Sequence, residues 1–249
     1  MALKSFEDVL HSVSSVEGWM SDDQARRLFD AAASTTSGDQ IVEIGSFRGR
    51  STVVLASAAP EGVRVVAIDP HAGNDRGPEE IAGFEAEASD DHHVFLANLA
   101  AAGVSGRVTH LRQFSDVAHR DVEGEVAVLY VDGAHRYAPA RADIRTWGAR
   151  VGDGGTMLIH DSFSSVGVTL AILRELLLGG RFRYVGRARS MTVYRADLRS
   201  GALARGVNAL RQLAQVPWFV KNLMLKVMLK AGLGGILKRI RGREVEWPY

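Results

Sequence analysis

The sequence has no cysteine among its 249 residues, which excludes a disulfide framework and a thiolate metal site. This absence fits a reducing compartment, so we expect a cytoplasmic protein. The first fifteen residues, MALKSFEDVLHSVSS, carry early charges and lack a long apolar core, so we expect no signal peptide. Internal repeats and low-complexity stretches are also missing. The length then suits one large α/β domain with a substantial core.

The formal net charge of +1 conceals an uneven distribution of charge along the chain. Residues 199–249 contain ten Lys or Arg and two Glu, a charge of +8, whereas residues 1–198 carry 20 basic and 27 acidic residues, a charge of −7. We therefore divide the chain into an acidic body, residues 1–198, and a basic tail, residues 199–249, which we expect to be helical and amphipathic. A basic tail indicates an anionic partner, such as a membrane surface or a nucleic acid, or simply a solvated helix.

Strand-like and helix-like segments alternate from about residue 40 onward. This alternation predicts a Rossmann-like, doubly wound α/β fold with a mostly parallel, seven-stranded sheet and helices on both faces. Two strands in direct succession at the end predict an antiparallel hairpin at one edge. The predicted strands cover residues 41–45, 64–69, 107–111, 126–131, 155–160, 182–187 and 191–195. The predicted helices cover residues 5–35 with a break at Gly18, 50–59, 79–102 with an interruption near residues 89–91, 138–150 and 166–178.

The segment LYVDGAHRY, residues 129–137, places an acid and a base where a buried strand ends. Residues 126–131 (VAVLYV) suit a strand that is covered on both faces, and Asp132 stops the run. In open α/β sheets the ligand crevice lies at the carboxyl ends of the strands. We therefore expect Asp132, a hard oxygen donor, and His135, a base that titrates near neutrality, to project into a pocket. The alternative is an aspartate that caps the next helix and a surface histidine.

A glycine turn joins the first predicted strand to its helix in the run EIGSFRGRS, residues 43–51. Gly45 and Gly49 let the backbone turn tightly and approach a ligand, and the helix N-terminus offers free N–H groups. Asp69, at the end of the second strand, suits a carboxylate that accepts both ribose hydroxyls of an adenosine. The spacing differs from the G-x-G-x-x-G of dinucleotide enzymes, and Phe47 opposes the close approach of a pyrophosphate. Together these features favour an adenosine ligand.

Four blocks of the sequence, EIGSFRGRS, AIDPH, LYVDGAHRY and GGTMLIHDS, resemble in their order the class I S-adenosylmethionine-dependent methyltransferases. Within that class they are similar to the branch that contains macrocin-type sugar O-methyltransferases and cephalosporin-hydroxylase-like proteins. The resemblance covers about residues 15–195 and implies S-adenosyl-L-methionine as the cofactor. It implies that the methionine moiety lies against the glycine turn, the ribose against Asp69 and the adenine near Ser115. The predicted cofactor-binding residues are Glu43, Gly45, Ser46, Gly49, Ser51, Asp69, Ser115 and Asp132.

A second acid, Asp161, follows the fifth predicted strand and should emerge beside Asp132 at the same sheet edge. Two converging carboxylates without a basic neighbour repel each other, which raises a pKa or recruits Mg²⁺ or another divalent cation. The resemblance also implies that Asp132 and Asp161 are metal ligands and that His135 is the catalytic base. The predicted reaction is a metal-assisted methyl transfer to an acceptor hydroxyl, from which His135 removes the proton.

Two positions depart from the pattern of the metal-dependent relatives. His160 stands where relatives often place another carboxylate, and Ser162 stands where they place an amide, so the set of hard oxygen ligands is smaller. Three interpretations of His160 remain open: a ligand of a softer ion, a second base, or a histidine that only donates a hydrogen bond. Further histidines fall in or near the long loop after the second strand, and we expect them to be solvated. These are His71, His92 and His93.

The basic tail contains an amphipathic segment, residues 216–243, with a broad apolar face. Asn222, Lys226 and Lys230 fall on one helical line, and the cluster KRIRGR follows at residues 238–243. A membrane-spanning helix is disfavoured, because each central lysine costs about 2.5–3.5 kcal/mol on insertion. Two interpretations remain: a helix that lies on an anionic membrane surface at the inner face, and a helix packed against the domain or a partner subunit.

These patterns predict an S-adenosylmethionine-dependent O-methyltransferase that acts on a sugar, a glycolipid or another small hydroxylated acceptor. One alternative is a nucleotide-dependent oxidoreductase or hydroxylase on the same fold, and another is a non-catalytic, membrane-associated binding protein. DNA or RNA methylation is disfavoured, because the acidic body lacks a basic groove and the sequence has no base-flipping motif. The sequence leaves open the acceptor, the identity of the ion and whether the chain forms a homo-oligomer.

Overall fold

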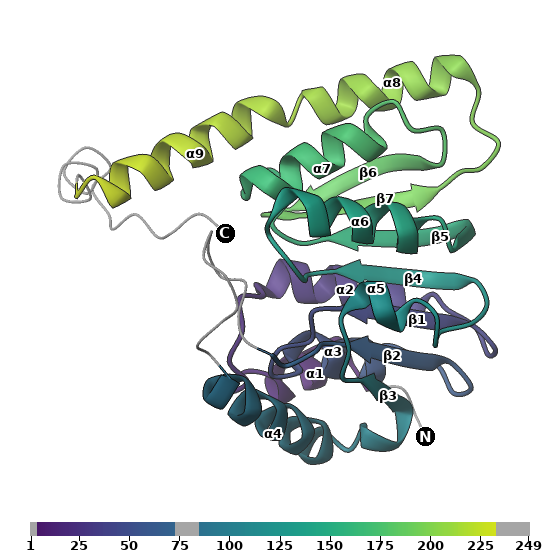
Figure 1. The fold of residues 1–249 in the computed structure, drawn as a ribbon. Helices are drawn as coiled ribbons and strands as arrows, with labels where there is room; N and C mark the ends of the chain where they lie inside the picture. The colour runs from purple at the N-terminus through teal and green to yellow at the C-terminus, as the bar shows by residue number, and fades with distance from the viewer. Residues whose placement is uncertain (1–3, 73–84, 233–249) are drawn as a thin grey trace.

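A seven-stranded sheet lies at the centre of a computed structural model, which describes residues 4–72 and 85–232 (Figure 1). The strand order is β3-β2-β1-β4-β5-β7-β6. The strands are β1 (Gln40–Ile44), β2 (Arg64–Ile68), β3 (Val108–Leu111), β4 (Val126–Val131), β5 (Val151–Ile159), β6 (Phe182–Ala188) and β7 (Met191–Ala196). Strand β7 runs antiparallel to both β5 and β6, and the other neighbouring strands pair in parallel. The predicted Rossmann-like sheet with an antiparallel edge pair is therefore confirmed.

Helices cover both faces of this sheet (Figure 1). One face packs against α1 (Phe6–Ser12), α2 (Asp22–Ala33), α3 (Arg50–Ala58) and α4 (Glu85–Ala102). The other face packs against α5 (Ser115–Ala118), α6 (Tyr137–Gly148) and α7 (Val166–Leu176). The predicted break at Gly18 is confirmed, since α1 and α2 are separate helices and Ser21 caps the second one.

Alternation of side chains along the strands divides the core into two layers. In β1, Ile41 belongs to the layer shared with α1 to α4, whereas Val42 and Ile44 belong to the layer shared with α6 and α7. The central strands are buried on both faces, which explains their continuous apolar runs. Glu43 is the one ionisable residue of β1, and its carboxyl group is fully buried and therefore needs polar partners.

Helix α4 differs from the prediction because it continues through residues 89–91. Serine and aspartate lower helix propensity by only a fraction of a kcal/mol per residue, about 0.5 or less relative to the better helix formers. Asp91 also gains a partner outside the helix, since Nε of Arg48 lies 2.7 Å from its Oδ1. The predicted interruption is therefore wrong. The part of the prediction that covers residues 79–84 lies outside the described residues.

The described part of the basic tail forms two helices that pack on the body, α8 (Ala202–Leu213) and α9 (Val216–Lys230) (Figure 1). The buried Asn208 of α8 donates a hydrogen bond to the carbonyl of Phe182 at 3.0 Å and accepts one from the amide of Tyr184 at 2.7 Å. In α9, Asn222 is buried and Lys226 is half-buried, so this part of the predicted polar line faces the body, whereas Lys230 is exposed. The cluster at residues 238–243 lies outside the described residues. Among the described helices none is long and apolar enough to cross a membrane.

Candidate active site

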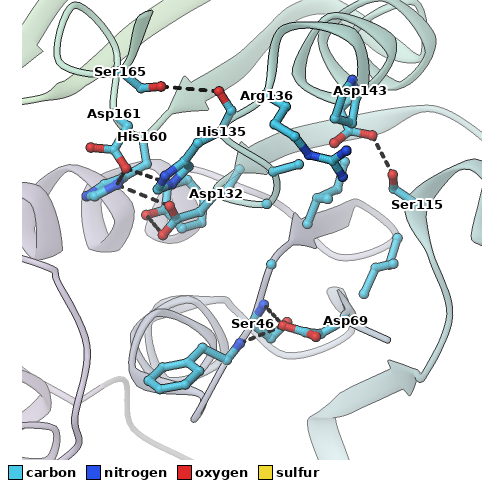
Figure 2. Close-up of a pocket in the computed structure, with 18 of the residues that line it drawn as sticks. Ser46, Asp69, Ser115, Asp132, His135, Arg136, Asp143, His160, Asp161 and Ser165 are labelled. Atoms are coloured by element: carbon cyan, nitrogen blue, oxygen red, sulfur yellow. Dashed lines mark hydrogen bonds and ion pairs between the residues drawn. The ribbon is translucent and has the colours of Figure 1, made fainter. Parts of the chain in front are cut away.

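A cleft of about 1430 Å³ opens at the carboxyl ends of β1, β2, β4 and β5. Figure 2 shows three groups of polar residues in it, near Asp132, near Asp69 and near Ser115. Of the residues predicted from the sequence, those that line the cleft are Gly45, Ser46, Ser51, Asp69, Ser115, Asp132, His135 and Asp161. Glu43 and Gly49 do not line it, and both contribute from behind its wall.

Two aspartates and two histidines meet where β4 and β5 end (Figure 2). We call these residues the carboxylate–histidine cluster: Asp132, His135, His160 and Asp161. Nδ1 of His160 lies 3.1 Å from Oδ1 of Asp132 and 3.4 Å from Oδ2 of Asp161. Nε2 of His135 lies 2.9 Å from the same Oδ2 of Asp161. The strand register explains the meeting, because Val131 pairs with Ile159 and the cluster follows directly after both.

The turn after β5 fixes the direction of Asp161. Asp161 and Phe163 both adopt left-handed backbone conformations, with φ of 51° and 55°. Such conformations are uncommon for residues other than glycine and cost of order 1–3 kcal/mol each, so the surrounding structure must hold them. The amides of Ser164 and Ser165 donate to the carbonyl of Asp161 and close this turn.

Charge within the carboxylate–histidine cluster is balanced by His160. Burial alone would lower the pKa of His160, but the carboxylates of Asp132 and Asp161 raise it well above its ordinary value. Burial alone would raise the pKa of Asp161, but His160 and His135 hold it well below its ordinary value. A charged imidazole therefore lies between two carboxylates. The sequence-based premise that these carboxylates lack a basic neighbour is wrong, because His160 is that neighbour.

His135 differs from His160 in its access to the cleft. The side chain of His135 is 37% exposed, whereas that of His160 is 3% exposed. Burial would lower the pKa of His135, but the hydrogen bond and the charge of Asp161 outweigh it and raise that pKa. A second ligand in the cleft can thus reach the imidazole of His135, which is oriented and made more basic by Asp161.

The carboxylate–histidine cluster also offers a donor set for a divalent cation. Asp132, His135 and Asp161 each present one ligand atom, and these atoms lie within 4.8 Å of one another. Two carboxylate oxygens and one imidazole nitrogen fit Mn²⁺, Fe²⁺ or Zn²⁺ as well as Mg²⁺. The charge of His160, which faces the same carboxylates, competes with such a cation.

Asp69 braces the glycine turn at the end of the cleft where the sequence predicts the cofactor, which we call the cofactor end (Figure 2). Its Oδ2 accepts hydrogen bonds from the amides of Ser46 at 2.9 Å and Phe47 at 2.8 Å, and its Oδ1 accepts one from the amide of His71 at 2.8 Å. Phe47 and His71 adopt left-handed conformations, with φ of 45° and 44°, which these bonds stabilise. Asp69, which the sequence predicts to bind the ribose, thus already accepts hydrogen bonds from three backbone amides.

Glu43 and Gly45 support the same turn from β1. The buried Glu43 accepts hydrogen bonds from the hydroxyls of Ser51, at 2.5 Å, and Thr52 at the start of α3. Burial raises the pKa of Glu43 to about 7, although these hydroxyls lower it. Gly45 has a φ of 86°, and a Cβ at this position would lie 2.2 Å from the carbonyl oxygen of Asp132. Only glycine therefore fits where the turn passes beneath the end of β4.

The third group lies around Ser115, near the expected position of adenine. Its hydroxyl lies 2.5 Å from Oδ1 of Asp143, and its carbonyl accepts a hydrogen bond from Nε1 of Trp147 at 3.2 Å. Burial raises the pKa of Asp143 to about 6. The sequence interpretation missed Asp143, although an acid on the buried stripe of α6, between Ala140 and Trp147, was the available signal.

Tyr130 was also missed. Its hydroxyl donates to Oδ2 of Asp132 at 2.8 Å. The signal was the alternation of β4, because residues two apart on a strand share a face. This bond fixes one carboxylate oxygen of Asp132, while His160 holds the other.

The three histidines that were expected to be solvated differ in their surroundings, and only His93 is exposed. His71 is buried, and its Nε2 lies 2.8 Å from the carbonyl of Phe47. His92 and His93 belong to α4, and the ring of His92 packs 5.0 Å from that of His71. The expectation of a solvated residue is therefore wrong for His71, because it forms part of the packing beneath the glycine turn.

Comparison with known proteins gives one family match and many similar folds. Residues 42–162 match a family described as "Methyltransferase domain". Similar solved structures include cofactor-bound Rv0187 from MTB, with 18% identity, coverage of 78% of this chain and 89% of that chain, and a TM-score of 0.54. The O-methyltransferase TomG from Streptomyces achromogenes, involved in tomaymycin synthesis and solved with SAM, has 15% identity, coverage of 79% and 92%, and a TM-score of 0.54.

A third similar structure is the O-methyltransferase from Bacillus cereus in complex with SAH. It has 14% identity, coverage of 79% of this chain and 93% of that chain, and a TM-score of 0.53. At such identities the three structures establish a shared fold. The family match, residues 42–162, contains every site residue predicted from the sequence, from Glu43 to Asp161.

Proposed function

We propose that this chain is a class I, S-adenosylmethionine-dependent O-methyltransferase that acts on a hydroxyl of a sugar, a glycolipid or another small acceptor. The match of residues 42–162 to a methyltransferase domain supports this proposal. The observation that carries the proposal is the pair of His135 and Asp161. A partly exposed imidazole, oriented by a buried carboxylate at 2.9 Å, stands in a cleft large enough for two ligands. This is the arrangement that a general base requires.

The residues of the chain have distinct roles in this reaction. S-adenosylmethionine, when bound, supplies an electrophilic methyl group. Asp161 accepts the hydrogen bond from Nε2 of His135, so that Nδ1 is the atom that takes the proton of the acceptor hydroxyl. The negative charge of Asp161 then stabilises the imidazolium that forms. His160 keeps Asp161 ionised, and holding both reactants in one cleft supplies further acceleration.

A divalent cation is a separate component of the proposal, and the carboxylates of Asp132 and Asp161 would hold it beside His135. Its chemistry there would be to lower the pKa of a bound hydroxyl. Chelation tests this component: with the cation, transfer falls after treatment with EDTA and returns with Mg²⁺ or Mn²⁺. Transfer that is unchanged by EDTA would leave His135 as the base without a metal.

Two measurements test the proposed function. Calorimetry should show that the protein binds S-adenosylhomocysteine and does not bind NADH. Incubation with S-adenosylmethionine labelled in its methyl group should then transfer label to a sugar or glycolipid fraction of a cell extract. A protein that bound NADH and not S-adenosylhomocysteine would instead be a nucleotide-dependent oxidoreductase. One that bound S-adenosylhomocysteine without transferring label would be a binding protein.

We also propose that the outward faces of α8 and α9 bind an anionic membrane surface. Large apolar side chains on these faces are exposed, among them Leu203 at 86%, Leu210 at 69% and Met224 at 62%. The sequence has no Asp or Glu from residue 198 to residue 243, so these faces are basic as well as apolar. Two copies of such a surface repel each other, whereas anionic lipid attracts both features.

Flotation with vesicles tests the membrane proposal on the full chain, because α8 is bonded to the body through Asn208. The protein should float with phosphatidylglycerol-containing vesicles at low salt and not with phosphatidylcholine alone. A double variant, Leu203→Ser with Leu210→Ser, should float less, while Leu96→Ser, which alters an exposed side chain on α4, should behave as the wild type. A wild-type protein that stays in the soluble fraction at low salt would rule out the proposal.

A further inference from the structure

The inner face of α9 forms one wall of the cleft. Three of its residues, Leu223, Lys226 and Lys230, line the cleft together with the carboxylate–histidine cluster. They are separated by three and four positions, which places them on one side of the helix. We call the end of the cleft at the carboxylate–histidine cluster the acceptor end. A part of the basic tail that was expected to lie on a membrane surface or to pack on protein thus lines this end of the cleft.

Lys226 is held at this end by the loop that follows β5. Its Nζ donates hydrogen bonds to the carbonyl and the hydroxyl of Ser164, each at 3.0 Å. Ser164 lies three residues after Asp161, and its amide donates to the carbonyl of Asp161. The charge of Lys226 is thus placed beside the carboxylate–histidine cluster, and Lys230 extends the positive charge by one helical turn along the same wall.

The acceptor end does not need these lysines to neutralise its acids. His160 and His135 already contact Asp161, and His160 contacts Asp132 as well. Across the cleft, the acids Glu17 and Asp91 are paired with Arg48. The two ammonium groups on α9 thus add positive charge to a wall of the cleft that also carries the apolar side chain of Leu223.

We propose that Lys226 and Lys230 form an anion-binding subsite for a phosphate or carboxylate group on the acceptor, with Leu223 against the carbon skeleton beside it. The acceptor is then an anionic hydroxylated molecule whose charged group lies against α9 while its hydroxyl faces His135. This inference rests on the proposed function, because it assumes that the cleft holds a hydroxylated acceptor. An ammonium on a helix that is packed against the body offers a fixed point charge to either anion.

The affinities of three probes for the protein loaded with S-adenosylhomocysteine test the subsite. The probes are glucose 6-phosphate for the phosphate source, glucuronate for the carboxylate source and glucose as the uncharged reference. At least one charged probe should bind about tenfold more tightly than glucose, and added salt should reduce that preference. The double variant Lys226→Gln with Lys230→Gln should lose the preference, while Lys221→Gln, which removes a charge from an exposed position outside the cleft, should keep it.

Each result is decisive for the subsite. Charged probes that bind no better than glucose, or that do not bind at all, overturn it, as does a double variant that keeps the preference. Binding of S-adenosylhomocysteine in the same experiment separates the two proposals, since its loss in the wild type would contradict the methyltransferase itself. A thermal unfolding curve of each variant checks that the substitutions preserve the fold.

Discussion

The two ends of the cleft use acids at strand ends in different ways. At the cofactor end, the carboxyl groups of Glu43 and Asp69 are satisfied by hydroxyls and backbone amides. At the acceptor end, the carboxyl groups of Asp132 and Asp161 are satisfied chiefly by imidazoles. Amides and hydroxyls do not titrate in the physiological range, whereas imidazoles do.

The partners of a carboxylate therefore indicate whether it stabilises the backbone or takes part in proton transfer. A carboxylate that is bonded to backbone amides fixes the shape of a turn, and its hydrogen-bond partners stay the same when the pH changes. When a carboxylate is hydrogen-bonded to a histidine, the protonation states of the two groups depend on each other. The same sequence signal, an acid directly after a buried strand, therefore has two meanings, which the partners of the acid decide.

The largest effect is expected where the two ends touch. Gly45→Ala places a Cβ 2.2 Å from the carbonyl oxygen of Asp132 and demands a left-handed conformation from alanine. We expect a loss of about 3 kcal/mol or more in the free energy of unfolding, or no soluble protein. Gly103→Ala is the matched control, because Gly103 also has a positive φ but no atom within 4 Å of the added Cβ. Chemical denaturation compares the two, and equal losses would deny the steric role of Gly45.

The next largest effect is expected at the acceptor end alone. His135→Ala should lower the rate of methyl transfer by about 10²–10⁴-fold, because it removes the general base. Its affinity for S-adenosylhomocysteine should remain nearly unchanged, since His135 belongs to the acceptor end. His93→Ala, an exposed position outside the cleft, serves as the control. A His135 variant with full turnover would remove this residue from the role of base.

A smaller effect is expected in the pH profile of Asp161→Asn. Asp161 raises the pKa of His135, and transfer requires the neutral imidazole, so the activity of the wild type falls as the pH drops through that raised pKa. The variant lowers the pKa of His135, and the acidic limb of kcat/KM should move to lower pH, together with a lower maximum. An acidic limb that does not move would show that another group controls it.

The effect expected for Glu43→Gln, at the cofactor end, lies in the dependence of stability on pH. The pKa of Glu43 is raised from 4.5 to about 7 by burial. Its protonated form therefore favours the folded state, and this stability is present below pH 4.5 and is lost as the pH rises through about 7.

Glutamine stays neutral, so the variant should lack this loss, which amounts to at most about 1.4 kcal/mol per pH unit in the wild type. Thermal unfolding between pH 4.5 and 8 measures the slope, with Glu61→Gln at an exposed position as the control. Parallel slopes for the wild type and Glu43→Gln would show that Glu43 does not titrate in this range.

Much of the fold could be predicted because the strands are buried on both faces and therefore read as apolar runs. The meeting of Asp132 and Asp161 also followed from the sequence, because their strands are parallel neighbours. The position of Glu43 behind the wall of the cleft was not predicted. The alternation of β1 could have shown it, because it puts Glu43 on the same face as Ile41, toward α3. The charge balance by His160 depends on side-chain directions after a strained turn, which no periodicity reports. The helical character of the basic tail also followed from the sequence, whereas the burial of Asn208 and Gln212 in α8 did not.

The contact between Gly45 and the carbonyl of Asp132 has a consequence for redesign. It joins the wall that faces the donor to the wall that faces the acceptor through main-chain atoms. The distance between the two walls is then set by the main chain, whereas the subsite proposed for the acceptor lies on α9, a separate helix near the end of the described chain. An engineer can therefore exchange the inner face of α9 to change the acceptor while the reacting distance stays as it is.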